Sequence, residues 1–289
     1  MSLTPASLTD FLAAHSAAVL AELTAVRGSS PREAGAFMVI SAEATIGTIG
    51  GGALEYMVID RARQVLRQGG AGDALDIPLG PEIGQCCGGR VDVGLRRLDA
   101  KAGVGLVRRL EAERAAWPRI YLFGAGHVGQ ALTRALAALP LDVHVVDTRR
   151  DELAGLPETV TTHAVAMPEA VVRAAPEGSS YVILTHDHAL DFLICAEALQ
   201  RADAPYVGMV GSRTKKARFR SWYLDADYPP APLGRLVLPI GSVGFPEGLG
   251  DKRPAVIAAL AAAEIVMHIG RTEVSEPGRH ERSGVDIGR

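Results

Sequence analysis

Residues 119–147, RIYLFGAGHVGQALTRALAALPLDVHVVD, decide the fold of the second half of the chain. The run 119–123 has the length and apolar character of a strand, and it leads into GAGHVG and then into apolar residues at helical spacing. A second strand-like run, 142–147, ends at Asp147. Strand, glycine turn, helix, strand and terminal acid occur here in the order of the dinucleotide-binding fingerprint.

The three glycines of this turn have different expected roles. Gly124 makes the tight turn, Gly126 lets a pyrophosphate approach the backbone, and Gly129 lets the helix pack close to the strand. The helix start adds free N–H groups and the positive end of a dipole. Asp147 would accept hydrogen bonds from a ribose-like diol. We therefore expect a phosphate-bearing ligand, which the motif does not identify; the alternative is a doubly wound domain that keeps the turn without a nucleotide.

The rest of the C-terminal half repeats the same alternation. Further strand-like runs lie at 162–167, 181–186, 206–211 and 235–240. Helical stretches lie at 189–202, 212–226 and 253–269. Alternating strands and helices predict an α/β fold, a Rossmann-like doubly wound parallel sheet over residues 119–270.

The N-terminal half is less regular and predicts a smaller α+β domain over residues 1–100. Residues 53–68 form an amphipathic helix in this prediction, and residues 101–118 a helical connector to the second domain. Residues 271–289 are polar and aperiodic, so we expect a disordered tail. The helix is expected to turn one set of apolar side chains to the core: Leu54, Met57, Val58, Val65 and Leu66.

Two glycine-rich segments, 28–40 and 45–55, resemble two halves of one binding surface. In the second, Gly50, Gly51 and Gly52 directly precede the helix, a pattern that can bind an anion or form a turn without a ligand. Arg32 could pair with a phosphate or remain solvated. Glu55, in the first helical turn, fits a helix cap or dipole partner as well as a catalytic acid.

Cys86 and Cys87 stand side by side in GPEIGQCCGGRVDVG, residues 80–94. A disulfide between neighbours would be strained, because their Cα atoms lie only ~3.8 Å apart. The remaining interpretations are a soft ligand for a metal or sulfur species, a reactive thiol, or an inert buried pair. Arg90 favours the thiolate form modestly. A zinc site does not fit, because no further ligands follow at a suitable spacing.

Composition narrows the class of protein. The 289 residues are 48% hydrophobic and 22% charged, with a formal net charge of −3. This balance gives no electrostatic reason to expect nucleic acid or an anionic membrane as a partner. Only three cysteines favour a reducing compartment. The start of the chain does not read as a secretory signal and no run spans a membrane, so we expect a cytoplasmic protein.

Taken together, the motifs resemble the XdhC/CoxI family, and within it the XdhC branch. The segments that carry the resemblance follow one another in the family's order: GSSPREAG (28–35), GTIGGGALE (47–55), LGPEIGQCCGGRVDV (79–93), LFGAGHVGQAL (122–132), LTHDHALD (184–191), YVGMVGSRTKKARF (206–219), LPIG (238–241) and DKRPAVIAALAAAEI (251–265).

The resemblance implies a molybdenum-cofactor chaperone. Such a protein binds molybdopterin cofactor, keeps it while a cysteine desulfurase provides the terminal sulfido ligand, and delivers it to apo-xanthine dehydrogenase. The family's cysteine-glycine-glycine element corresponds to Cys87, Gly88 and Gly89, and Cys86 is typical of the XdhC branch. We expect one or both thiolates to contact molybdenum, because soft sulfur suits that metal. A homo-oligomer is compatible with this role.

Two further loops follow strand-like runs, where doubly wound sheets gather ligand contacts. His186, Asp187 and His188 could contact the cofactor, bind a metal, or only shape the loop. A second expected group of anion contacts begins the next helix: Ser212, Arg213 and Lys215.

Two other functions compete with the chaperone. In an NAD(P)-dependent oxidoreductase, Asp147 would select NAD and His186 or His188 would be the acid or base. A thiol-based redox sensor would explain Cys86 and Cys87 but would leave the glycine turns without a role. The absence of a clear substrate domain argues against the oxidoreductase.

Overall fold

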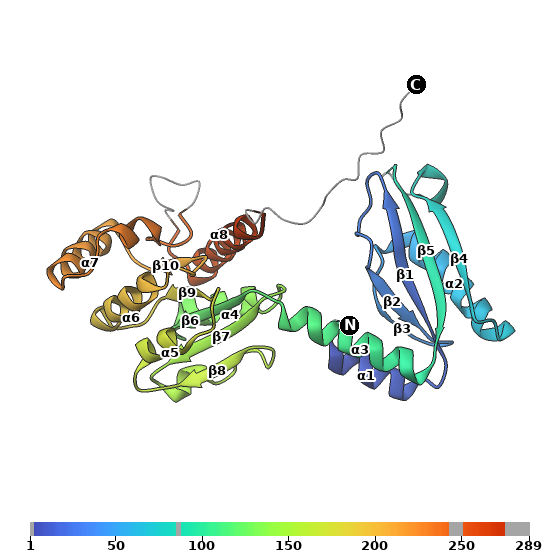
Figure 1. The fold of residues 1–289 in the computed structure, drawn as a ribbon, viewed down its shortest axis with the longest axis horizontal. Coiled ribbons are helices and arrows are strands. Elements are labelled where there is room, and N and C mark those ends of the chain that lie inside the picture. Colours follow the sequence, from blue (N-terminus) through green and yellow to red (C-terminus); the bar gives the residue numbers. More distant parts are fainter. Residues whose placement is uncertain (1–2, 85–87, 243–250, 275–289) are drawn as a thin grey trace, which may run out of the picture. The chain divides into compact units, whose positions relative to one another are not determined.

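The computed structural model describes residues 3–84, 88–242 and 251–274. The chain forms two compact units, and the division falls between Ala115 and Ala116 (Figure 1). Cys86, Cys87 and residues 275–289 lie outside the described residues. The first four residues of the tail expected over 271–289 are instead the last residues of helix α8, Pro254–Val274.

The first unit is built on an antiparallel sheet of five strands in the order β3-β2-β1-β5-β4 (Figure 1). Its strands are β1 Ala18–Arg27, β2 Phe37–Ile40, β3 Thr45–Gly47, β4 Gly72–Pro78 and β5 Arg90–Leu98. A short 3₁₀ helix, η1, spans Pro81–Ile83 between β4 and β5.

Helices cover both faces of this sheet. Along β1, Val19 and Ala21 join the core under helix α2, Gly52–Gln68. Leu20, between them, faces the other way and joins a core that includes side chains of α1, Pro5–Ala14, and α3, Ala100–Ala115. This alternation follows from the two-residue period of a strand.

Two details of this unit differ from the sequence expectations. Met57 is 44% exposed on α2, so the buried stripe of this helix consists of Leu54, Val58, Ala62 and Val65. The range expected as a connector is largely α3, whose Leu106 and Leu110 are buried in the first unit's core, so this helix is also part of that unit.

The second unit has six parallel strands in the order β8-β7-β6-β9-β10-β11. This is the Rossmann order, in which the direction of winding reverses between β6 and β9. The predicted fold class is therefore confirmed. The strands are β6 Arg119–Phe123, β7 Asp142–Asp147, β8 Thr161–Ala164, β9 Ser180–Ile183, β10 Val207–Met209 and β11 Leu236–Val237.

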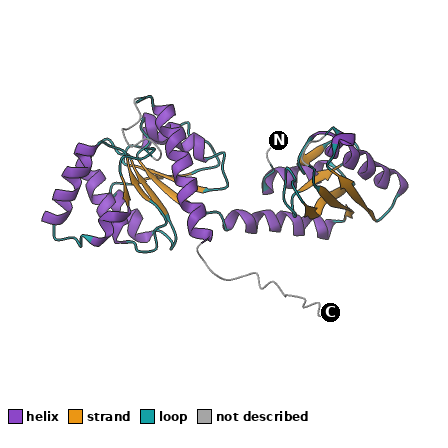
Figure 2. Ribbon diagram, turned by 90° about the horizontal axis from the view of Figure 1, so that it is seen from above, coloured by secondary structure: helices purple, strands orange, loops and turns teal. Residues whose placement is uncertain are grey.

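Helices lie on both faces of the parallel sheet (Figure 2). One face packs on α4, His127–Leu136, and α8, Pro254–Val274. The other packs on α5, α6 and α7. The bounds of these helices are α5 Pro168–Ala174, α6 His188–Gln200 and α7 Arg213–Asp225, and the described part of the unit also contains the 3₁₀ helices η2 Arg150–Leu153 and η3 Ala231–Arg235.

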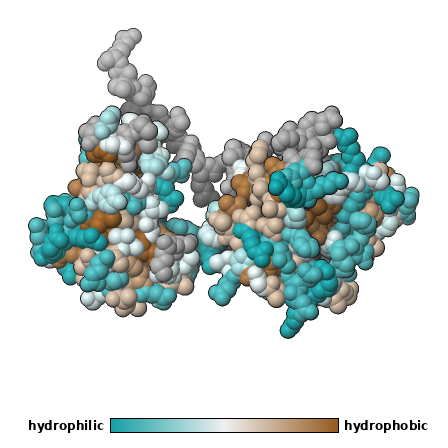
Figure 3. Space-filling model, turned by 180° about the vertical axis from the view of Figure 1, so that it is seen from behind, coloured by the Kyte–Doolittle hydropathy of each residue, from teal (hydrophilic) through white to brown (hydrophobic). Residues whose placement is uncertain are grey.

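The surface mixes hydrophilic and hydrophobic residues on both units (Figure 3). Large apolar side chains that remain exposed include Tyr56 at 72% and Met167 at 59%. Within residues 3–84, 88–242 and 251–274, no helix has both the length and the apolar composition needed to span a bilayer.

Candidate functional site

Three glycine-rich segments of the first unit meet at one place. Gly28 has φ +73°, and a Cβ atom there would lie 3.3 Å from the Cα atom of Gly89. A Cβ atom on Gly89 would lie only 2.0 Å from the carbonyl oxygen of Ser29. These backbones are in contact, and position 89 excludes any side chain.

The third segment lies against the same loop. A Cβ atom on Gly50 would come within 2.7 Å of the Pro31 ring, so residues 28–32 contact both the 47–52 turn and Gly89. Arg32 is exposed. Gly88 donates to the Leu79 carbonyl at 2.9 Å and Leu79 donates to that of Gly89 at 2.8 Å, which closes the loop that contains the two cysteines.

The 47–52 turn already holds an anion from its own chain. The Glu55 carboxylate accepts from the backbone N–H groups of Ile49 and Gly51, both at 2.9 Å. It also accepts from the Thr48 hydroxyl at 2.5 Å. Burial opposes the charge of Glu55, but these hydrogen bonds outweigh burial and lower its pKa. Of the roles considered for Glu55, the structure supports the cap.

The charges beside the cysteine loop are paired. Arg90 donates to the Asp76 carboxylate through Nε at 2.5 Å and Nη2 at 2.8 Å. Arg27 donates to Asp92 at 2.7 Å. The Arg90 charge that was expected to favour a thiolate is therefore offset by Asp76.

In the second unit, the three glycines of the turn after β6 have distinct surroundings. Gly124 has φ +115°, and a Cβ atom there would lie 2.4 Å from the Leu184 carbonyl oxygen. Gly129 lies against the turn itself, because its Cβ atom would lie 2.0 Å from the Gly124 oxygen. Gly126, at the start of α4, has no atom of the described residues within 4 Å of such a Cβ. Only Gly126 faces open space, as the approach of a phosphate requires.

Asp147 ends β7 beside this turn, but its carboxylate is occupied. One oxygen accepts the Ala125 N–H at 2.8 Å, and the other accepts the Arg149 N–H at 2.9 Å. The Arg149 guanidinium covers both oxygens at 3.1 and 3.2 Å and also pairs with Glu152 at 3.0 Å. Burial would raise the pKa of Asp147, but the bonds from Arg149 and Ala125 outweigh burial and lower it. A ribose diol would have to displace Arg149 to reach this acid.

A small recess at the carboxyl ends of the strands brings together Gly124, Asp147 and His186. Its volume is about 10 Å³, which is about the room that one water molecule needs. The recess marks the expected edge of the sheet and is not a preformed nucleotide pocket.

The loop after β9 has a mainly structural arrangement. Asp187 caps α6 by accepting from the Ala189 N–H at 2.8 Å. His186 and His188 are exposed. No group of three or more histidine, cysteine, aspartate or glutamate side chains within the described ranges is placed to hold a metal ion.

The sequence interpretation missed the residue that organises this loop. Asp191 is fully buried, and its carboxylate accepts from Thr185 through N at 2.9 Å and Oγ1 at 2.8 Å. Lys215, expected as an anion contact, is instead buried, pairs with Asp191 and donates to the Val210 carbonyl at 2.9 Å. Thus Asp191 and Lys215 join the loops that follow β9 and β10.

Ser212 caps α7 by accepting from the Lys215 N–H at 3.2 Å, and Arg213 is the exposed first residue of that helix. Both residues lie where the sequence placed them, at a helix start after β10. Lys215 differs, because it faces inward toward Asp191.

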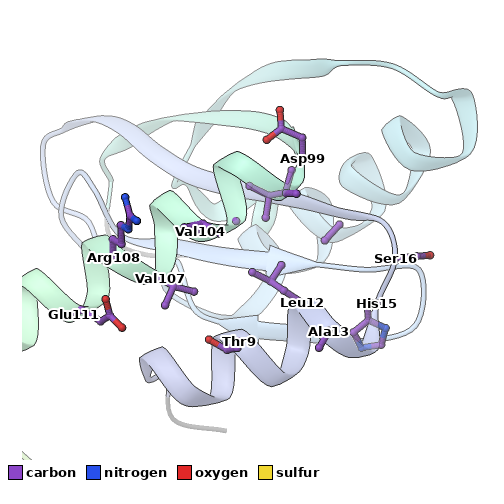
Figure 4. Close-up of a pocket in the computed structure, with 14 residues that line it drawn as sticks. Thr9, Leu12, Ala13, His15, Ser16, Asp99, Val104, Val107, Arg108 and Glu111 are labelled. Carbon is purple, nitrogen blue, oxygen red and sulfur yellow. The ribbon is translucent and has the colours of Figure 1, made fainter.

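A groove with a volume of about 570 Å³ lies between α1 and α3 of the first unit (Figure 4). Leu12, Val104 and Val107 contribute apolar side chains to it, with Arg108 and Glu111 toward one end (Figure 4). None of the site residues expected from the sequence lines this groove. We place the candidate site at the glycine segments, because their backbones meet there and Gly88 directly follows Cys86 and Cys87 in the sequence.

Comparison with known proteins gives matches over both units. A model of the XdhC Rossmann domain matches residues 120–265, and one of the XdhC and CoxI family matches residues 11–77. The uncharacterized protein YqeB of Escherichia coli (strain K12) is 26% identical over 262 residues, which are 86% of this chain and 42% of YqeB. The chain thus spans less than half the length of this curated relative.

Among solved structures, a protein described as a xanthine dehydrogenase from Bacillus halodurans is similar along nearly the whole chain. The TM-score is 0.75 at 20% sequence identity, and the similarity covers 95% of this chain and 98% of that one. At this identity the likeness supports the fold.

Proposed function

The chain belongs to the XdhC and CoxI family, and on that premise we propose that it is an accessory protein in the maturation of xanthine dehydrogenase. It binds molybdopterin cofactor as cargo, holds it while a cysteine desulfurase supplies the sulfido ligand, and delivers it to the apoenzyme. This work takes place in the cytoplasm, and the chain acts there alone or as a homo-oligomer.

The contacts among three glycine segments, one of which directly follows the two cysteines in the sequence, carry this proposal. Gly28 contacts Gly89 through the backbone, and the Pro31 ring lies against Gly50, so three segments far apart in sequence lie together. A surface with so few side chains lets a flat ligand approach backbone N–H and carbonyl groups closely. Cys86 and Cys87 directly precede Gly88 in the sequence.

The residues of this surface divide the work. One or both of the thiolates of Cys86 and Cys87 contact the molybdenum, because soft sulfur ligands suit this metal. The backbone surface consists of the Gly28 loop with Gly50, Gly51, Gly52 and Gly88, and the buried Gly89 packs against Ser29. Arg32, exposed beside that surface, supplies a positive charge for the cofactor's phosphate.

Two glycine turns at helix starts could bind a phosphate, and they differ in whether an anion of the protein already occupies them. The turn at residues 47–52 is filled by Glu55. Among the described residues, no atom blocks the start of α4 at Gly126, which favours the turn of Gly124, Gly126 and Gly129 as the site of a separate phosphate-bearing ligand such as a nucleotide.

The test is reconstitution of the purified full chain with molybdopterin cofactor released from a molybdoenzyme. We expect molybdenum and pterin fluorescence to comigrate with the protein in gel filtration. If the cofactor does not comigrate and NADH binds tightly, the protein is an oxidoreductase and the proposal is wrong.

Cysteine variants make this test specific. Cys87→Ala should lose most of the bound molybdenum and Cys86→Ala less, with thermal melts close to wild type. Cys195 is the matched control, because it is fully buried in α6 and burial raises the pKa of its thiol. Cys195→Ala should change packing and leave molybdenum content unchanged. Wild-type molybdenum in the single and double variants of Cys86 and Cys87 would show that the thiols are not ligands.

A further inference from the structure

A chain of polar side chains crosses strands β6, β7 and β8 of the second unit. Arg119 donates to the Asp142 carboxylate at 2.6 Å. The same carboxylate lies 3.1 Å from Nε2 of His144, and Nδ1 of His144 lies 2.9 Å from Nε2 of His163. Asp142 is the first residue of β7, so this chain starts at the opposite end of the strand from Asp147.

The hydrogen-bonded row of Asp142, His144 and His163 can hold only a limited number of protons. A carboxylate only accepts, so Nε2 of His144 is protonated and donates to Asp142. Between the two rings, either His163 donates to a neutral His144, or a protonated His144 donates to His163. Protonation of both rings would bring two N–H groups face to face and two positive charges together, with the ring centroids 5.2 Å apart.

The surroundings add to the cost of the second charge. The Tyr121 ring stacks on His144 with centroids 4.7 Å apart and lies 6.3 Å from His163. Burial, and then the charge of His144, lower the pKa of His163. Elements packed on these strands carry further charged or titratable groups: Arg119 of β6, Tyr181 of β9, and Arg150, Asp151 and Glu152 of η2.

The attachment of β8 to the sheet depends on this histidine pair more than the attachment of a longer, buried strand would. It is a four-residue edge strand, Thr161–Ala164, and His163 is its one residue that is not exposed. Beyond β8, the Val165 N–H donates to the Asp147 carbonyl at 3.2 Å. Pro168 then lines the recess beside Asp147. The strand and the wall of the recess are therefore continuous.

We propose that His144 and His163 form a pH-sensitive latch for β8. With one proton between the facing ring nitrogens, the pair holds the strand on the sheet; with both of these nitrogens protonated, it releases β8 and the recess wall that follows. The latch is separate from the proposed function and requires no bound cofactor.

The direction of the pH effect follows from proton linkage. The pKa of His163 in the latched state lies below its ordinary value of 6.5, so the released state binds more protons. The latch is at full strength above about pH 6.5, the ordinary histidine pKa, and it weakens as the pH falls from there toward the lowered pKa of His163.

Hydrogen exchange of the cofactor-free full chain between about pH 8 and about pH 5 tests the latch. After correction for intrinsic rates, amides of β8 and Val165 should lose protection at acidic pH, while β6 amides keep theirs. A histidine NMR titration of the same protein should show His163 titrating below an unfolded histidine.

His163→Gln separates the latch from a general acid effect, since an amide can donate to His144 but cannot titrate. This variant should abolish the pH dependence of β8 protection. His15→Gln, which removes a histidine from the first unit, should leave it unchanged. The proposal is overturned if β8 protection is the same at both pH values, or if His163 titrates at or above the unfolded value.

Discussion

Gly126→Val and Gly129→Val place the same side chain into two environments, one with free space around the new Cβ atom and one without. At Gly126 a Cβ atom would meet nothing within 4 Å. The backbone there has φ −68° and ψ −170°, which valine adopts without strain. At Gly129 the Cβ atom would lie 2.0 Å from the Gly124 oxygen and 2.8 Å from a Leu184 methyl group.

The stability cost of each change follows from these contacts. Gly126→Val loses a favourable helix N-cap residue, at about 1 kcal/mol. Gly129→Val must move α4 away from Gly124 and Leu184, and we expect at least about 3 kcal/mol, the upper range for overpacking. In a domain of this size about 1 kcal/mol shifts the melting temperature by about 2–4 °C, so Gly129→Val should melt about 6–12 °C lower.

Binding should show the reverse order. A valine at Gly126 projects into the space that a phosphate would use, so affinity for a phosphate-bearing ligand of this turn, with NADH as the probe, should fall at least about tenfold, or about 1.4 kcal/mol. Thermal melts and titrations on the same preparations provide both numbers. Equal melting losses in the two variants, or unchanged affinity in Gly126→Val, would refute the phosphate role of this turn.

Two further predictions concern residues that hold the loops. Glu55→Gln should cost about 1–3 kcal/mol at neutral pH, because it removes charged hydrogen bonds to the 47–52 turn. Since its pKa is lowered from 4.5, urea unfolding should show this difference shrinking as the pH falls below that value. Asp191→Ala should lower the free energy of unfolding by about 3–5 kcal/mol, because Lys215 is left buried and unpaired. The double variant Asp191→Ala with Lys215→Met should recover part of the melting temperature. No recovery would contradict the pairing.

Much of the fold was predictable because local patterns and tertiary structure agree. β6 and β7 have the bounds expected from the runs 119–123 and 142–147, since strands buried on both faces are apolar throughout. Met57 was assigned to the wrong face, because a stripe of apolar residues on a helix has no sharp border. Helix α1 was missed, although Thr4 and Pro5 are start signals for it.

The site was less predictable because its decisive contacts join distant residues. The fingerprint predicts Asp147 at the end of a strand. It does not predict that the Arg149 guanidinium covers this acid, because Arg149 belongs to no sequence motif. Asp191 meets Lys215 across 24 positions of sequence, and no periodicity indicates such a pair. The meeting of Gly28 with Gly89 likewise depends on the pairing of β1 with β5.

The two glycine turns show why a local pattern does not decide a ligand. Both place glycines at the start of a helix, where N–H groups point outward and favour a negative charge. At α2 the chain supplies that charge itself, because Glu55 lies one turn into the helix and folds back onto Ile49 and Gly51. The first turn of α4 contains no acid, and the nearby Asp147 is held by Ala125 and Arg149. An external anion would therefore meet competition at the first turn and open space at the second.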